Sequence, residues 1–329
     1  MSLAPDPPAD TRSPPAHRRL ELWETGFTGI RTFAGCPYVN SPEDVDVAIV
    51  GVPFDGAASF RPGARFGPEA IRSASGTLRG YHPGFDVEVF EDLSVVDWGD
   101  LDILPANTER TISEVSRTIG ALAAREVAPI VLGGDHSIAG GEVAGLSAAL
   151  GPVAIVLLDA HADTLQQEEE GQPFSHGTWL RRAVEQGMVI PESSVLAGMR
   201  GPVLDAAELE WPRQAGFDVI SCDKLRDMGP KRFAKRVTKR TGDTPTHLSV
   251  DIDVVDPAFA PGTGTPEVGG LASHELLALI RSLGEDVDLR GFDVVEVSPP
   301  YDNGGQTTAL LAANVVYDFL ALIALTWND

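Results

Sequence analysis

The sequence predicts an α/β protein built on one mostly parallel sheet with helices on both faces. Eight short runs rich in apolar and β-branched residues recur along the chain, at 45–51, 93–98, 128–132, 153–159, 194–197, 217–221, 247–251 and 291–296. Most of these runs are continuously apolar rather than alternating, which is typical of strands covered on both faces. Helical patterns lie between them, at 108–126, 178–186, 273–282 and 306–325. Strands and helices that alternate in this way favour a parallel sheet.

Two helix starts and the domain boundaries follow from local sequence. Asn107 and Ser273 precede apolar-periodic segments, so both are predicted N-caps whose side chains accept a hydrogen bond from the first turn. Residues 1–20 are rich in proline and have no apolar periodicity, which predicts a flexible Pro-rich N-terminal arm. No internal repeat and no linker-like break follows residue 20. Residues 21–329 are therefore predicted to form a single catalytic domain.

The charge balance narrows the choice of partners. The chain has 25 Lys and Arg against 48 Asp and Glu, a net charge of −23. Such a field repels nucleic acid and anionic membranes, and it attracts metal ions and small guanidinium or ammonium compounds. Cys36 and Cys222 lie far apart without a CxxC spacing, so the sequence indicates two reduced thiols rather than a disulfide or a thiolate zinc site.

The predicted location of the protein rests on two features that the sequence lacks, a secretory signal and a membrane span. The first residues contain no continuous apolar stretch typical of a secretory signal. No later segment reaches the roughly 18 uninterrupted apolar residues of a membrane span. We therefore expect a soluble, cytoplasmic protein with no membrane partner.

Metal-ligating residues follow four of the predicted strands. In parallel α/β sheets, ligands bind beyond the carboxyl ends of the strands, so side chains at these positions are expected to meet. Residues two apart on an extended segment point the same way, which brings the side chains at 159, 161 and 163 together if the chain stays extended beyond the strand. The residues at the strand ends are His136, Asp159, His161, Asp163, Asp251, Asp253 and Glu296.

The number of ligands predicts two metal ions. A single strand-end Asp is usually a cap and a single His is usually an interior residue, so the prediction rests on their convergence. Excluding Glu296, the set holds four carboxylates and two imidazoles, whose charge two divalent cations nearly balance. Oxygen donors with imidazole and no thiolate favour Mn(II), while Fe, Co, Ni and Zn stay possible. Two ions about 3.5–4 Å apart would lower the pKa of a water between them for hydrolysis.

Three sequence blocks resemble the signature motifs of the ureohydrolase family, which comprises arginases, agmatinases and related amidinohydrolases. The blocks are GGDHS at 133–137, DAHADT at 159–164 and SVDIDVVDPAFAPGTGTP at 249–266. The third block is long and highly specific. The resemblance runs from about residue 26 to residue 325 and includes PFD at 53–55 and RPGARFGP at 61–68.

The resemblance implies a fold, a cofactor and a reaction. It implies an arginase-like three-layer α/β/α fold with about eight strands, a homotrimer or homohexamer, and two Mn(II) ions per subunit, with Ni(II) or Co(II) as alternatives. The implied reaction hydrolyses a guanidino group to urea and an amine. By position, the implied metal ligands are His136, Asp159, His161, Asp163, Asp251 and Asp253.

The resemblance also implies catalytic roles. His176 matches the histidine that delivers a proton to the leaving amine, a task suited to the pKa of imidazole. Glu296 matches the carboxylate that holds the substrate guanidinium. Asp163, if it contacts the attacking hydroxide, would accept its proton. Without the resemblance, His176 would more often be a residue that caps a helix.

The choice of guanidino compound stays open at the level of sequence. The segments at 260–267 and 298–302 favour the agmatinase-like branch, whose substrates include agmatine, 4-guanidinobutyrate, 3-guanidinopropionate, proclavaminate and free guanidine. Where that branch usually has Pro-Phe, this chain has Trp179-Leu180, so Trp179 is a candidate pocket wall or a helix core residue. The acidic run at 168–170 would attract an ammonium tail, or it is a solvated charge run.

Two rival functions remain. A non-catalytic relative that acts as an assembly subunit would normally have lost ligands, and all six are present here. A hydrolase of formimino or acetylated amines could use the same metal scaffold and would release formamide or acetate in place of urea.

Overall fold

A computed structural model describes residues 29–327, except 42, 168–172 and 204. The predicted N-terminal arm and the acidic run at 168–170 lie outside the described residues. The single domain at 21–329 stays a prediction.

Eight strands form one central sheet, and every pairing between them is parallel. Along the sheet they are β4 (Val95–Asp100), β1 (Val47–Gly51), β5 (Ala128–Leu132), β10 (Leu289–Val295), β9 (Thr246–Asp251), β6 (Ala154–Leu158), β7 (Val195–Met199) and β8 (Asp218–Ser221). Two short antiparallel strands, β2 (Tyr81–His82) and β3 (Val87–Glu88), form a separate hairpin. The parallel sheet predicted from the apolar runs is confirmed.

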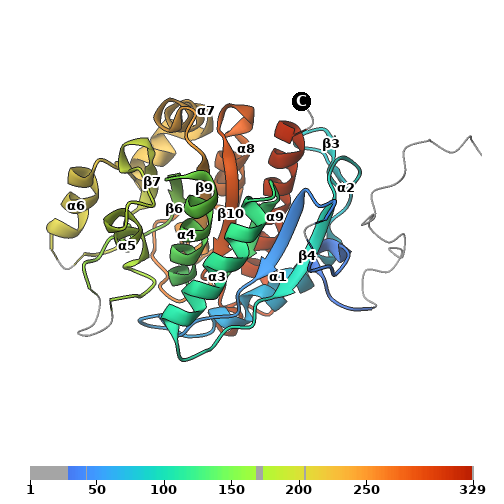
Figure 1. Cartoon of the computed structure of the whole chain (residues 1–329). Coiled ribbons are helices and arrows are strands. Elements are labelled where there is room, and N and C mark those ends of the chain that lie inside the picture. Colours follow the sequence, from blue (N-terminus) through green and yellow to red (C-terminus); the bar gives the residue numbers. More distant parts are fainter. Residues whose placement is uncertain (1–28, 42, 168–172, 204, 328–329) are drawn as a thin grey trace, which may run out of the picture.

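Helices cover both faces of the sheet, which gives three layers (Figure 1). One apolar core contains side chains of α1 (Gly67–Ala74), α7 (Cys222–Thr241), α8 (Ser273–Arg281) and α9 (Thr307–Trp327). The core on the opposite face contains side chains of α3 (Thr108–Ala123), α4 (Ala139–Leu150) and α5 (Trp179–Glu185). Two further helices are α2 (Val89–Asp92) and α6 (Ala207–Ala215).

Glycines allow α3 and α4 to lie very close together. A Cβ atom on Gly141 would lie 2.6 Å from the carbonyl oxygen of Ile112, and one on Gly145 would lie 2.6 Å from that of Ser116. Any larger residue would push α4 away from α3. Since α4 begins directly after His136–Ile138, this close contact also fixes the segment that carries the first predicted ligand.

Helix α9 combines great length with high apolarity. By length and composition, its segment Thr307–Thr326 is the one candidate membrane span among the described residues, with a mean hydropathy of 1.9. In the fold, however, 83% of that apolar window is buried against the sheet and its neighbouring helices (Figure 1). The apolarity of α9 is therefore accounted for by the core.

Local predictions from the sequence had mixed outcomes. Asn107 caps α3, because its side chain accepts a hydrogen bond from the Arg110 amide at 2.9 Å. Ser273 was predicted as the N-cap of α8, and that prediction was wrong. Ser273 is the first residue of the helix, and Ala272 is the N-cap. The Ala272 amide donates a hydrogen bond to the Glu275 carboxylate, which closes the first turn. Five helices, α1, α2, α4, α6 and α7, were not among the predicted helical patterns. Helix α4 is apolar on almost all sides, and α7 contains Gly229 and Pro230 at a kink.

Truncating Phe319 should strongly destabilise the fold. Phe319 is fully buried on α9, and its ring centroid lies 4.9 Å from that of Phe292 on β10. We expect Phe319→Ala to lower the free energy of unfolding by about 3–5 kcal/mol, measured by urea denaturation. Leu310→Ala on the same helix is the control, because Leu310 is 42% exposed. Equal effects of the two substitutions would contradict the packing described here.

Candidate metal centre

Four adjacent strands bring the predicted site residues to one edge of the sheet. Strands β5, β10, β9 and β6 are consecutive neighbours at its centre. His136 follows β5, Asp159 follows β6, Asp251 ends β9 and Glu296 follows β10. Because parallel strands all end at the same edge, residues more than a hundred positions apart meet there.

The first group of ligand atoms surrounds the imidazole of His136. Its Nδ1 atom lies 2.9 Å from Asp163 Oδ2 and 3.2 Å from both Asp159 Oδ2 and Asp251 Oδ2. His136, Asp159 and Asp163 form one of the groups whose ligand atoms are close enough to hold a single ion.

The second group surrounds His161. Its Nδ1 atom lies 3.1 Å from Asp253 Oδ2 and 3.4 Å from Asp159 Oδ1. These three residues form another group with the spacing of a metal site. Asp159 belongs to both groups, with Oδ2 facing His136 and Oδ1 facing His161. Its carboxylate could therefore offer one oxygen to a cation at each group.

The donor set fits divalent cations. The four carboxylates are all buried, with none more than 7% exposed. Burial, together with the charges of Asp253 and Asp159, raises the pKa of the Asp251 carboxyl well above its ordinary value. His136 Nδ1 and Asp159 Oδ2 are also buried without a hydrogen bond in the described part of the chain. Cations at the two groups would satisfy both atoms and offset the repulsion between the carboxylates.

The chain turns directly after the strands that carry ligands. The carboxylate of Asp251 accepts a hydrogen bond from the Asp253 amide at 2.8 Å, and that of Asp159 accepts one from the His161 amide at 2.6 Å. A short 3₁₀ turn, Ile252–Val254, follows Asp251. These turns replace the extended path expected from the alternating spacing. The ligands converge because each Asp bends the chain that carries the next one.

Two residues of the site have left-handed backbone conformations. Asp163 has a φ angle of 52° and Glu296 one of 61°. Such values are uncommon outside glycine and are retained at positions that the surrounding structure holds firmly. Here they direct two carboxylates toward the same space.

Glu296 and His176 lie next to the ligand groups. Glu296 Oε1 accepts a hydrogen bond from the His136 amide at 2.9 Å and lies 3.0 Å from His176 Nδ1. Glu296 Oε2 is buried and has no hydrogen-bond partner within the described residues. This oxygen is therefore free to accept a hydrogen bond from a bound molecule.

Ser59, which sequence reasoning missed, completes this part of the site. The Ser59 amide donates to His176 Nε2 at 3.2 Å, and the Ser59 hydroxyl lies 2.7 Å from the same atom. Since an amide can only donate, Nε2 is the acceptor and the ring proton is assigned to Nδ1, which faces Glu296. Ser59 is exposed and lines the cavity, so it links His176 to solvent.

A cavity of about 580 Å³ opens onto the ligands. Among the residues that line it are His161, Asp163, His176 and Asp251, with Arg213 of α6. Trp179, a candidate pocket wall, is not among the residues that line this cavity and is only 2% exposed. Its indole donates a hydrogen bond to Asp163 Oδ2 at 2.7 Å, and its ring lies 5.1 Å from that of His136. Trp179 thus lies behind the ligands and orients one of them.

A buried network of hydrogen bonds, also missed by sequence reasoning, contacts the Nε2 side of the His136 ring. His136 Nε2 lies 2.9 Å from the Ser249 hydroxyl, which donates to Asp293 Oδ1 at 2.9 Å. Asp293 Oδ2 in turn lies 2.8 Å from His247 Nε2. Ser249 on β9 and its pairing partner Asp293 on β10 were the available signal, since both are polar residues inside apolar runs. The network fixes the ring that presents Nδ1 to a cation.

Arg200 holds the loop that contains Asp253. Its guanidinium donates to the carbonyl oxygens of Asp253 and Glu267, both at 2.6 Å. The Arg200 side chain therefore holds together the two ends of the segment from Asp253 to Glu267.

The parallel sheet, the two His and Asp groups and the cavity above them define an α/β protein with a candidate binuclear metal site. The arginase family model matches residues 45–322. The chain belongs to the arginase family.

Several curated relatives are similar over nearly their whole length. Proclavaminate amidinohydrolase of Streptomyces clavuligerus is 39% identical over 296 residues, which cover 89% of this chain and 94% of the relative. Guanidinobutyrase of Pseudomonas aeruginosa is 37% identical over 300 residues, which cover 90% and 93% of the two chains. The solved structure of the S. clavuligerus proclavaminate amidinohydrolase matches with a TM-score of 0.87 and 38% identity, and the match covers 92% of this chain and 99% of that one.

Removing the Ser249 hydroxyl should weaken metal binding without removing a ligand. We expect Ser249→Ala to lower Mn(II) affinity by about 10- to 100-fold, because the His136 ring loses the partner that orients it. Isothermal titration calorimetry on metal-free protein would measure the change. Ser94→Ala is the matched control, since Ser94 is a buried serine with a hydrogen bond to the Asp44 carbonyl, just before β4. Unchanged affinity in Ser249→Ala would contradict the orienting role.

Proposed function

We propose that this protein hydrolyses a guanidino compound to urea and an amine. The observation that carries the proposal is Glu296 Oε2, a buried and unpaired carboxylate oxygen beside two groups of metal-ligating residues. A carboxylate in this position suits a planar guanidinium, which is cationic and donates several N–H bonds. The similarity to a guanidinobutyrase and a proclavaminate amidinohydrolase supports the same reaction.

The proposed cofactor is a pair of Mn(II) ions, with Ni(II) or Co(II) as alternatives. Six side chains would hold them: His136, Asp159, His161, Asp163, Asp251 and Asp253. When bound, two divalent cations lower the pKa of water at the site and so supply a nucleophile near neutral pH.

The side chains of the protein bind the substrate and move protons. Glu296 Oε2 accepts a guanidinium N–H and so holds the central carbon above the ligand groups. Asp163, which lines the cavity, accepts the proton of the attacking water. His176 first takes a second proton at Nε2 from solvent, through the Ser59 hydroxyl that lies 2.7 Å from this atom. The imidazolium then gives its Nδ1 proton, which lies on the side of Glu296 Oε1, to the departing amine and returns to the neutral ring.

The residues that line the cavity indicate which kind of substrate tail would fit. Two arginines line the cavity, Arg200 and Arg213. Arg200 is saturated by backbone carbonyls. Arg213 is exposed and donates through one nitrogen to the Leu209 carbonyl at 2.5 Å, which leaves the rest of its guanidinium available. We therefore favour a guanidino acid such as 4-guanidinobutyrate, whose carboxylate would pair with Arg213, over agmatine. Agmatine, 3-guanidinopropionate, proclavaminate and free guanidine are the alternatives.

The remaining parts of the proposal concern assembly and location. We propose that the protein acts as a homotrimer or homohexamer in the cytoplasm. The substrate is a small molecule, and the net charge of −23 disfavours nucleic acid and anionic membranes as partners.

Urea release tests the proposed reaction. With Mn(II), we expect the protein to release urea from at least one of agmatine, 4-guanidinobutyrate, 3-guanidinopropionate, proclavaminate or guanidine. His176→Asn should lower kcat by about 10²- to 10⁴-fold with metal content unchanged, because it removes only the proton donor. Asp159→Ala should lose both metal and activity, since Asp159 faces both ligand groups. Formamide or acetate release, or no product from any of these compounds, would contradict the proposal.

The role of Arg213 is tested by comparing substrates. We expect Arg213→Gln to raise KM for 4-guanidinobutyrate by about fivefold, the effect of one exposed ion pair. Turnover of free guanidine, which has no tail, should be unchanged and serves as the control. A KM for 4-guanidinobutyrate that does not respond to the substitution would show that the tail lies elsewhere.

A further inference from the structure

Gly264 leaves an empty position beside two oxygen acceptors of the site. A Cβ atom at this glycine would lie 3.2 Å from the backbone carbonyl oxygen of Arg61 and 3.3 Å from Glu296 Oε2. Apart from Gly264 and its chain neighbours, no other heavy atom of the described residues lies within 4 Å of that Cβ position. The two oxygens therefore border the same space, which the missing side chain leaves open.

Neither of these oxygens receives a hydrogen bond from the part of the chain that the structure describes. Glu296 Oε2 is buried and unpaired. No N–H or O–H group of a described residue donates to the Arg61 carbonyl. Two acceptors that border one space repel each other, and a cation with N–H groups on two of its edges would satisfy both.

The segment that carries Gly264 is held on both sides. The Ser298 amide donates to the Gly262 carbonyl at 2.7 Å, and the Thr265 hydroxyl donates to Asp253 Oδ2 at 3.3 Å. Because Asp253 is one of the proposed metal ligands, the open position at Gly264 is fixed relative to the ligand groups.

The Arg61 carbonyl is held by its own side chain and by the turn that follows. The Arg61 guanidinium lies over the rings of Phe60 and Tyr301, 5.1 and 5.3 Å from their centroids, which are cation–π distances. Two residues further on, the Gly63 amide donates to Asp55 Oδ2 at 2.7 Å. A firmly held backbone therefore presents this carbonyl to the space beside Glu296.

The two oxygens of Glu296 face different neighbours. Oε1 lies 3.0 Å from His176 Nδ1, the proposed source of the proton for the departing amine. Oε2 borders the space beside the Arg61 carbonyl. The side toward Oε1 thus suits the nitrogen that leaves with the substrate tail, and the side toward Oε2 suits a terminal nitrogen that stays on the central carbon.

The number of terminal nitrogens distinguishes guanidines from formimino compounds. A substituted guanidinium has two terminal amino groups besides the nitrogen that carries the tail. A formimino group has one terminal nitrogen, and a C–H replaces the other. Only a guanidinium can therefore donate to both Glu296 Oε2 and a second acceptor from its terminal nitrogens.

We propose that the Arg61 carbonyl is a second acceptor for the substrate guanidinium and that Gly264 keeps the space for it open. This inference rests on the proposed function and adds a selection within it, for guanidines over formimino compounds. A site built to hydrogen-bond a group rejects an analogue that lacks the group, because the acceptor of the site is then left unpaired.

The binding of two small cations tests the proposal without a substrate tail. Guanidinium and formamidinium are planar cations that differ in one amino group, which formamidinium replaces by hydrogen. The measurement is isothermal titration calorimetry on Mn(II)-loaded His176→Asn protein, which keeps Glu296 and lacks the proton donor that would let it consume the ligand. We expect guanidinium to bind at least about tenfold more tightly than formamidinium, the effect of one hydrogen bond.

A substitution at Gly264 should remove this preference. In the same protein, Gly264→Ala should weaken guanidinium binding at least about tenfold, since its methyl group fills the space that the terminal nitrogen needs. Gly304→Ala is the matched control, because a Cβ atom there meets no heavy atom within 4 Å. Far-UV circular dichroism and Mn(II) content, both expected to be unchanged, would separate the effect from misfolding or metal loss.

Three results would overturn the proposal: no binding of guanidinium, equal binding of the two cations before any change at Gly264, or equal effects of Gly264→Ala and Gly304→Ala. The comparison of the two cations needs no glycine substitution, so it decides even where Gly264→Ala does not fold. Urea release together with equal binding would contradict the role of Arg61 and leave the proposed reaction intact. Selective binding without urea release would contradict the reaction alone.

Discussion

The burial of four carboxylates at one edge of a parallel sheet is the constraint on which the rest of the site depends. Like charges in a dry environment repel, so Asp159, Asp163, Asp251 and Asp253 are tolerable together only with cations or protons between them. His136 and His161 divide this acidic cluster into two groups, and Asp159 belongs to both. The surrounding structure holds these atoms in place: a serine and an aspartate behind His136, an indole behind Asp163, and an arginine around the Asp253 loop.

The fold supplies rigidity where the proposed chemistry needs it. The ligands lie at or just beyond the carboxyl ends of the central strands β5, β6 and β9, which are hydrogen-bonded on both sides and covered by helices on both faces. The proposed substrate and proton groups, by contrast, come from loops beside the cavity, where Ser59 reaches solvent. Parallel α/β proteins commonly combine a rigid strand edge with variable loops, which lets related chains keep one reaction and change the substrate tail. Arg213 on α6 belongs to that variable part.

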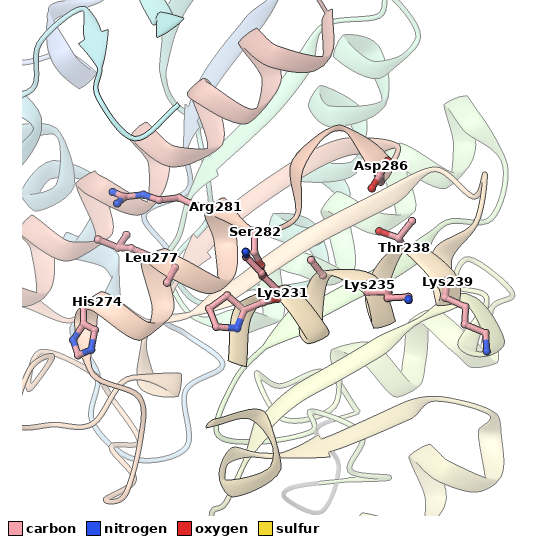
Figure 2. A pocket seen from close by; sticks show the side chains of 12 residues that line it. Lys231, Lys235, Thr238, Lys239, His274, Leu277, Arg281, Ser282 and Asp286 are labelled. Carbon is pink, nitrogen blue, oxygen red and sulfur yellow. Dashed lines mark hydrogen bonds between the residues drawn. The ribbon is translucent and has the colours of Figure 1, made fainter. Parts of the chain in front are cut away.

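Charge is unevenly distributed along this chain. The acidic excess surrounds a site proposed to attract metal ions and a cationic guanidinium. All four lysines of the chain lie on α7, and three of them line an open groove that also contains Asp286 (Figure 2).

The sequence by itself determined the sheet and the ligand set. Continuous apolar runs specify buried parallel strands, and the Asp and His residues that end them are ligands at the edge where such strands meet. Only the tertiary structure decided which atoms meet. Helix α4 lacks an amphipathic pattern because it is buried almost all round, and α7 carries a Gly-Pro kink, so periodicity identified neither. Trp179, Ser59 and the pair Ser249 and Asp293 act through contacts between residues distant in sequence, and no local pattern encodes such distances.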